Sequence, residues 1–317
     1  MQCNNLIQHQ CDSMDNNKFM FGVFNDLLKE YVEAEIADKL LGKTGLELLQ
    51  NLVAVWDSFV IYAISADRMF AYLNRNWIKN QQMAQVAEQC MRFFQRNIYE
   101  QIKVNICNAL LEQIDEDRAR RAIDKDVVKK AIKVYADLGL EAPVAKRDPK
   151  TGTFDWVGKV NLRVYNVDFE AQYLTDTRET SERYALVWNA QLNAPEYCLN
   201  VQKFLTNEET NADFWLHTQP PDADKREQRQ STTELMKAIC IEEMVSKRAL
   251  EVSEKETGCT HMFQQRNNNE LKLLFDVFRR DETTYKFIID KMVPYIQTRG
   301  KTTVEQEDLL KDPSLFS

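Results

Sequence analysis

Glycine, proline and histidine are scarce in this sequence. The 317 residues include 8 Gly and 7 Pro, well below average usage, so few turns are expected and long helices are favoured. The three histidines, His9, His217 and His261, are too widely separated to predict a catalytic triad. Cys259 with His261 lacks further ligands for a metal. The sequence therefore predicts no catalytic residue, no metal site and no cofactor.

Paired cysteines are absent as well. The seven cysteines are odd in number, scattered, and form no C-x-x-C pair. Cys90 and Cys107 fall inside apolar helical stripes, which favours buried free thiols over disulfides or metal ligands.

Basic charge and long apolar runs are also lacking. A net charge of -8 and a pI near 5.2 argue against broad nucleic-acid binding, because that activity needs a basic surface. No apolar run is expected to reach the roughly 18 to 20 residues of a membrane span, and residues 1–17 are too polar for a signal-peptide core. We therefore expect a cytoplasmic or nuclear protein with no nucleic-acid or membrane partner.

Two short stretches contain the G-K-T of a phosphate-binding loop, "LGKTGL" and "RGKTTV". That loop needs another glycine five positions earlier and must follow a strand. Ala37 and Tyr295 occupy those positions, and both flanks have helical patterns. Nucleotide binding is therefore not predicted.

The first half of the chain has the apolar periodicity of long helices. The first pattern covers 19–41 and stops near Gly42, and Thr44 can cap a second that continues to Trp77. The third covers 83–118 and repeats at a step near four: Val86, Cys90, Phe94, Ile98, Ile102, Ile106, Leu110 and Ile114. Asp124 can cap a fourth helix, which Gly139 ends.

The second half repeats this order of elements. Residues 141–160 contain several Gly and Pro and are predicted to form a loop, and no strand is expected anywhere. Helical periodicity then resumes, with a cap at Asn193 and a capping box at Ser231 and Glu234. We predict an all-α, elongated array of helical bundles divided into 1–140, the loop 141–160, 161–275, and the start of a third bundle at 276–317.

Several segments resemble the N-terminal repeats of cullins. They are "LLQNLVAVWDSF", "MFAYLNRNWI", "NICNALLEQIDEDR" with "VYADLGL", and "VYNVDFEAQYLTDT". The resemblance extends from about residue 19 to Pro313 and is strongest for cullins that use an SCF-type adaptor. It implies an array of cullin repeats, in which "AYLNRNWIKN" braces the face where a substrate adaptor docks. We expect Leu73 and Trp77 to anchor this segment, with Tyr72 and Arg75 on the solvated side.

The sequence departs from the cullin pattern at both ends. Cullins have two helices before the segment that resembles 19–41, and the second helps to bind the adaptor. Here only "MQCNNLIQHQC" is present at that place. Leu6 and Ile7 are therefore the candidate adaptor-binding residues that remain of the second helix. The resemblance also implies that the C-terminal cullin-homology region is missing, so a RING subunit is not expected to bind. A fragment, an incomplete gene model or a truncated paralogue would explain this.

The outward side of the 83–118 helix is the other half of the adaptor surface that the resemblance implies. If Val86, Cys90 and Phe94 point toward the core, the side chains on the opposite side of the helix point into solvent. A phenylalanine there, Phe93, is a candidate hot spot for binding. The opposing interpretation is that Phe93 packs against a neighbouring helix. The predicted adaptor-binding residues on this helix are Gln85, Gln89, Arg92, Phe93 and Arg96.

The sequence therefore favours a non-catalytic scaffold of a ubiquitin ligase, whose partner is a Skp-type or BTB-type substrate adaptor. The alternative is a helical tethering subunit of a vesicle-docking complex, which shares the rod architecture. A nucleotide hydrolase is the third hypothesis and rests only on the two G-K-T stretches.

Overall fold

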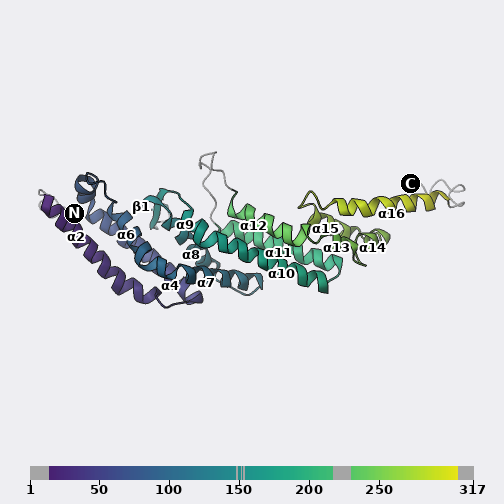
Figure 1. Cartoon of the computed structure of the whole chain (residues 1–317), viewed down its shortest axis with the longest axis horizontal. Helices are drawn as coiled ribbons and strands as arrows, with labels where there is room; N and C mark the ends of the chain where they lie inside the picture. The colour runs from purple at the N-terminus through teal and green to yellow at the C-terminus, as the bar shows by residue number, and fades with distance from the viewer. Residues whose placement is uncertain (1–13, 148, 151, 153, 217–229, 306–317) are drawn as a thin grey trace. The chain divides into compact units, whose positions relative to one another are not determined.

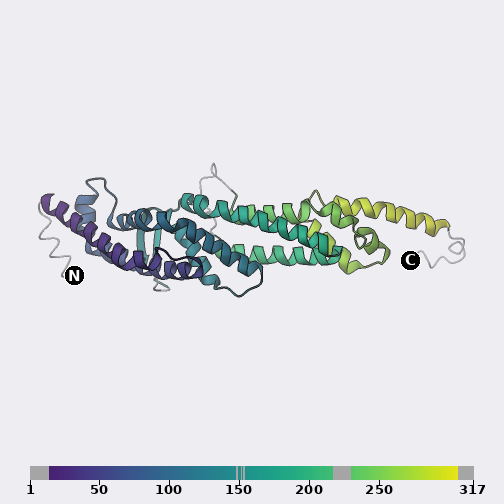
Figure 2. The same cartoon turned by 60° about the horizontal axis from the view of Figure 1, so that its bottom comes forward.

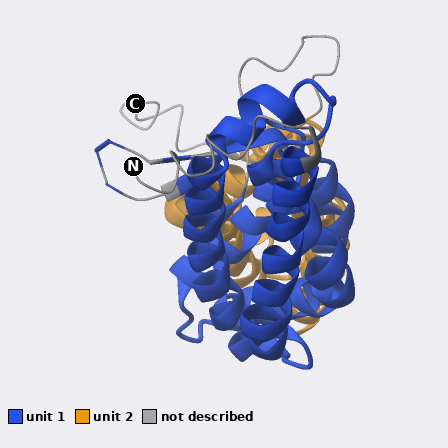
Figure 3. Cartoon of the chain, turned by 90° about the vertical axis from the view of Figure 1, so that its left-hand side faces the viewer, with its two compact units in different colours: residues 1–173, 214–229 blue, residues 174–213, 230–317 orange. Residues whose placement is uncertain are grey.

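The computed structural model describes residues 14–147, 149–150, 152, 154–216 and 230–305 (Figure 1). Helices dominate these residues, which confirms the predicted fold class apart from one pair of strands. Two compact units can be distinguished, 1–173 with 214–229 and 174–213 with 230–317 (Figure 3). This division does not test the predicted repeat boundaries, which stay a prediction.

Unit 1 is built around one long apolar helix. Helix α4 contacts α6, α7, α8 and both strands. Its buried side includes Leu52, Trp56 and Phe59. The elements of this unit are α2 (Met14–Tyr31), η1 (Val32–Ala37), α3 (Asp38–Leu40), α4 (Gly45–Met69), α5 (Ala71–Leu73), η2 (Asn74–Ile78), α6 (Val86–Phe94), η3 (Gln95–Tyr99), α7 (Glu100–Arg118), α8 (Lys125–Leu138), β1 (Glu141–Arg147), β2 (Phe154–Lys159), α9 (Arg163–Tyr165) and η4 (Asn166–Glu170).

Helix α4 corrects the expectation that no segment is long and apolar enough to span a membrane. It has 25 residues, and an 18-residue window within it has a mean hydropathy of 1.4. More than half of that window is buried inside the unit, so the apolar character of α4 is accounted for by its packing.

Several helices contain a π turn, in which hydrogen bonds join residues five apart. In η3 the Glu100 N–H donates to the Gln95 carbonyl, and in η2 the Lys79 N–H donates to the Asn74 carbonyl. Such wide turns place one extra residue in a helix without ending it. The chain from Val86 to Arg118 is therefore continuous helix, as the step of four predicted.

The predicted loop at 141–160 is wrong, because its residues form an antiparallel hairpin (Figure 2). Pro143 and Gly158 caused the error, since both usually interrupt strands. Both lie at the irregular end of the hairpin, where the register shifts between Glu141 and Val144. A Cβ on Gly158 would lie 2.8 Å from the Glu141 carbonyl oxygen, so the glycine permits this close crossing.

A buried polar network ties the hairpin to the helices. Trp56 donates from Nε1 to Asp137 Oδ2 over 3.1 Å, joining α4 to α8. Lys133 donates to Asp137 over 2.9 Å and to Asp155 on β2 over 2.6 Å. Burial raises the pKa of Asp137 to about 6, against the opposing effects of Lys133 and Trp56.

The raised pKa of Asp137 predicts a pH-dependent stability. The folded state favours the protonated acid, so this contribution is fully present below pH 3.8 and is lost as pH rises through about 6. That gap corresponds to about 3 kcal/mol, at 1.36 kcal/mol per pKa unit. The free energy of unfolding of the wild type minus that of Asp137→Asn should fall by about 2 kcal/mol between pH 4 and pH 7, because part of the contribution is already lost at pH 4. Urea unfolding at those two pH values measures it, and parallel pH profiles for the two proteins would contradict the prediction.

Unit 2 contains the remaining helices. Its elements are α10 (Ala171–Gln191), which begins at the end of unit 1, α11 (Ala194–Trp215), whose last two residues belong to unit 1, α12 (Thr232–Ile241), η6 (Glu242–Ser246), α13 (Ala249–Glu254), α14 (Cys259–Gln264), α15 (Asn268–Phe278) and α16 (Lys286–Glu305). The predicted capping box at Ser231 and the predicted cap at Asn193 are both present. Ser231 and Glu234 exchange hydrogen bonds at the start of α12, and Asn193 and Glu196 do so at the start of α11.

Helices α10, α11 and η6 are joined through buried polar contacts. Tyr197 on α11 donates its hydroxyl to the Met244 carbonyl over 2.6 Å. Glu243, whose side chain is 1% exposed, pairs with Arg178 from α10 and with Lys247. A buried carboxylate is stable only with such partners, so this pairing fixes α10 against η6.

Candidate partner-binding face on α6 and η3

The face predicted to bind an adaptor lies along α6 and η3 in unit 1. We call it the α6–η3 face and define it as Gln85, Gln89, Arg92, Phe93 and Arg96. Gln85, Arg92 and Arg96 are exposed, whereas Gln89 and Phe93 are half-buried. Helical spacing places all five on one side, opposite the buried stripe of this helix. Leu6 and Ile7 lie outside the described residues.

An aromatic cluster supports this face from below. The ring of Phe94 lies 5.0 Å from Trp56 and 5.2 Å from Phe59, and Phe94 is fully buried. Its neighbour Phe93 is half-buried. This intermediate burial does not test either interpretation of Phe93, so both stay predictions.

Asn74 fixes the beginning of α6. Its Nδ2 donates to Asp67 Oδ1 over 2.8 Å, and its Oδ1 accepts from the Val86 N–H over 3.0 Å. The side chain thus links the end of α4 to the first turn of α6, where N–H groups otherwise lack partners. Sequence analysis missed this residue. The signal in the sequence was that the amide side chain of Asn74 lies between Leu73 and Ile78, two apolar residues that are buried in the structure.

Trp77 anchors its segment by packing on α2, as predicted, whereas the bracing of an adaptor-docking face stays a prediction. Its ring lies 5.6 Å from Phe21 of α2, and it is half-buried. Leu73 is fully buried and Arg75 is exposed, as predicted, whereas Tyr72 is half-buried. The segment "AYLNRNWIKN" therefore joins α2, α4 and α6 through side chains on several sides.

The charges on the α6–η3 face are positive. Arg92 pairs with Glu88 one turn earlier, and Arg96 is exposed. Gln89 donates to the Ala84 carbonyl over 3.4 Å, a weak bond that leaves most of its amide available. A half-exposed aromatic ring between cations and amides is a surface suited to protein partners.

The other candidate chemistry does not form sites. The first G-K-T lies between α3 and α4, where Gly42 has φ +77° and Lys43 pairs with Glu47. The second lies inside α16. Neither follows a strand, so the phosphate-loop geometry is missing at both. No cluster of three metal-ligating side chains occurs within the described part of the chain.

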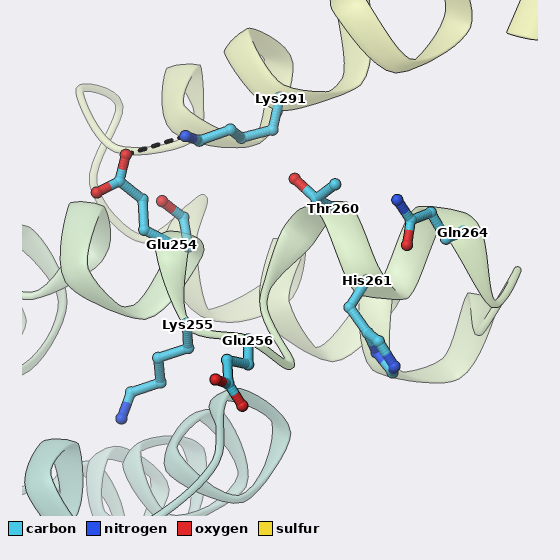
Figure 4. Close-up of a pocket in the computed structure, with 8 residues that line it drawn as sticks. Glu254, Lys255, Glu256, Thr260, His261, Gln264 and Lys291 are labelled. Carbon is cyan, nitrogen blue, oxygen red and sulfur yellow. Dashed lines mark hydrogen bonds and ion pairs between the residues drawn. The ribbon is translucent and has the colours of Figure 1, made fainter.

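A pocket of about 520 Å³ lies beside α13, α14 and α16 in unit 2 (Figure 4). An ion pair between Lys291 and Glu254 of 2.9 Å crosses its edge. Lys255 turns away and donates to the Leu192 carbonyl at the end of α10. His261 is the one histidine in this pocket lining, and the adjacent Cys259 is buried, with a pKa that burial raises to about 11.

Comparison with known proteins identifies the family. The model of the cullin alpha solenoid domain matches residues 2–314, so the chain belongs to the cullin family. It is 24% identical to Cullin-1 of Caenorhabditis elegans over 297 residues, which cover 90% of this chain and 35% of that protein. It is 21% identical to Cullin-1 of Oryza sativa, with 93% and 36% covered. It is 20% identical to Cullin-3 of Dictyostelium discoideum, with 99% and 36% covered. The chain thus spans about a third of the length of these relatives.

Proposed function

We propose that this chain is a non-catalytic scaffold arm of a multi-subunit ubiquitin ligase, acting in ubiquitin-dependent protein catabolism in the cytoplasm or nucleus. Membership of the cullin family supports this role. The arm would bind a Skp-type or BTB-type substrate adaptor through the α6–η3 face.

The observation that carries the proposed interface is the backing of the α6–η3 face by the buried core. Phe94 packs on two aromatic rings beneath it, and Asn74 holds the start of the helix. A face held in this way loses little side-chain and backbone freedom when a partner binds. The mechanism is geometric, since stacked helices hold the adaptor at a set distance from the rest of the ligase.

Substitution of Phe93 and Arg92 tests the interface. We expect Phe93→Ala and Arg92→Glu each to weaken adaptor binding at least about tenfold, because hot-spot truncations cost about 2 kcal/mol or more. Pull-down followed by titration calorimetry with a Skp-type adaptor and with a BTB protein measures this.

Matched controls come from unit 2. Phe275 is 47% exposed on α15, and Arg279 pairs with Asp276 at helical spacing as Arg92 pairs with Glu88. Phe275→Ala and Arg279→Glu should leave adaptor binding unchanged. Failure of the intact chain to bind either adaptor class would count against the scaffold function. If Phe93→Ala and Arg92→Glu leave adaptor binding unchanged, the α6–η3 face is not the interface, but the scaffold function stands. Recovery of the chain with membrane-tethering subunits would favour the alternative function.

A further inference from the structure

Helix α16 has an apolar side without a partner among the described residues. Ile289, Val293 and Ile296 are 42%, 42% and 56% exposed and recur at steps of four and three, which places them on one face. The other side is attached to unit 2, because Ile288 is buried and Tyr295 stacks on Phe263 of α14 at 5.7 Å. An exposed apolar row of this kind on a packed helix is typical of an interaction surface.

Two cations extend this surface. Arg299 and Lys301 follow Ile296 on the next turn, one on each side of the apolar row, and both are exposed. Neither has an ion-pair partner within the part of the chain that the structure describes. The α16 face, defined as Ile289, Val293, Ile296, Arg299 and Lys301, is therefore apolar with positive charge at its end.

Helix α2 in unit 1 has a face of the opposite charge. Phe19 and Leu27 are 69% and 50% exposed, and Asp26 and Glu30 lie beside them at helical spacing, followed by Glu33 in the adjoining η1. The three carboxylates line a shallow pocket of about 520 Å³ together with Lys29 and Ala34. The α2 face consists of the two exposed apolar residues and the three acidic residues.

Most of the negative charge on the α2 face is unpaired. Across the described residues, Asp26 and Glu30 have no ion-pair partner, and Glu33 has only Lys29 at 3.9 Å. The inward side of the helix is occupied, because Phe24 and Leu28 are buried.

We propose that the α16 face of one copy of this chain docks on the α2 face of a second copy. Apolar residues would be buried on both sides, and Arg299 and Lys301 would meet the carboxylates of α2. Pairing α2 with α2 would instead place like charges opposite each other. Because each copy carries both faces, the contact is heterologous and joins copies head to tail.

Self-association measured by analytical ultracentrifugation tests this proposal. The wild type should form dimers and larger species as its concentration rises, and association should weaken when salt rises from 50 to 500 mM, because the charges are exposed. Glu30→Lys with Glu33→Lys, or Arg299→Glu with Lys301→Glu, should each weaken association at least about tenfold. The chain with all four substitutions has both faces reversed and should associate again.

A mixing experiment separates this contact from a symmetric dimer. A chain with Ile289→Asp and Ile296→Asp keeps only the α2 face, and a chain with Glu30→Lys and Glu33→Lys keeps only the α16 face. Each should stay monomeric alone, while an equimolar mixture should form a dimer and nothing larger. A wild type that stays monomeric, a variant of α2 that dimerises alone, or a mixture without dimers would each overturn the proposal.

Discussion

Phe94→Ala should lower the free energy of unfolding of this chain by about 3 to 5 kcal/mol. The side chain is fully buried and touches the rings of Trp56 and Phe59. Its removal leaves a cavity that neither indole nor phenyl ring can fill without leaving its rotamer. Urea unfolding followed by circular dichroism measures the loss as a shift in midpoint at a constant denaturant slope.

The adjacent Phe93 provides the control for Phe94. Phe93 is half-buried on the α6–η3 face, so Phe93→Ala should cost less than about 1.5 kcal/mol of stability. The two substitutions thus separate folding from binding: Phe94→Ala acts on the core, and Phe93→Ala acts on the proposed interface. Equal losses of stability for the two variants would mean that the face is part of the core.

Gly139→Ala should also be strongly destabilising, by about 3 kcal/mol, at the upper end of the range for overpacking. A Cβ at this position would lie 2.0 Å from the backbone carbonyl oxygen of Asn161. The obstacle is backbone, so no side-chain rotation relieves it. The same urea titration measures the effect.

Gly22→Ala is the matched control. Gly22 lies within α2, and nothing approaches the position of its Cβ within 4 Å. Alanine is the better helix former, so this substitution should stabilise the chain by about 0.5 to 1 kcal/mol. A Gly139→Ala variant as stable as wild type would show that α8 and the segment at Asn161 can separate without cost.

The helices and their ends were predictable because they depend on local pattern. All eight residues of the stripe from Val86 to Ile114 are 2% exposed or less. Asp124 caps α8 through its side chain, and the backbone of Gly42 adopts a positive φ after the first helix. Thr44 occupies the cap position of α4 but makes no side-chain cap bond. These features follow from spacing and residue type within a few turns.

The polar contacts that hold the helices together were not predictable. Trp56 and Asp137 are 81 residues apart, and the sequence around either residue does not indicate that it contacts the other. Gly139 was predicted to end a helix, and it does, but its φ of −86° is ordinary. A side chain is excluded at Gly139 because the backbone carbonyl of Asn161 lies against it. Contacts of this kind depend on tertiary packing, which no local pattern encodes.

The helix that runs through α6, η3 and α7 packs on different elements before and after the π turn at Gln95–Tyr99. Upstream, α6 lies on α4 and β1, and downstream α7 lies on α4, α8 and η4. Losing one residue there would rewind the wide turn to an ordinary one and keep the packing faces of α6 and α7 in phase, whereas losing one residue within α6 or α7 would rotate one against the other by about 100°. Variation in length between homologous chains should therefore be tolerated at this turn and in the connections between helices, and should spare the rest of α6 and α7.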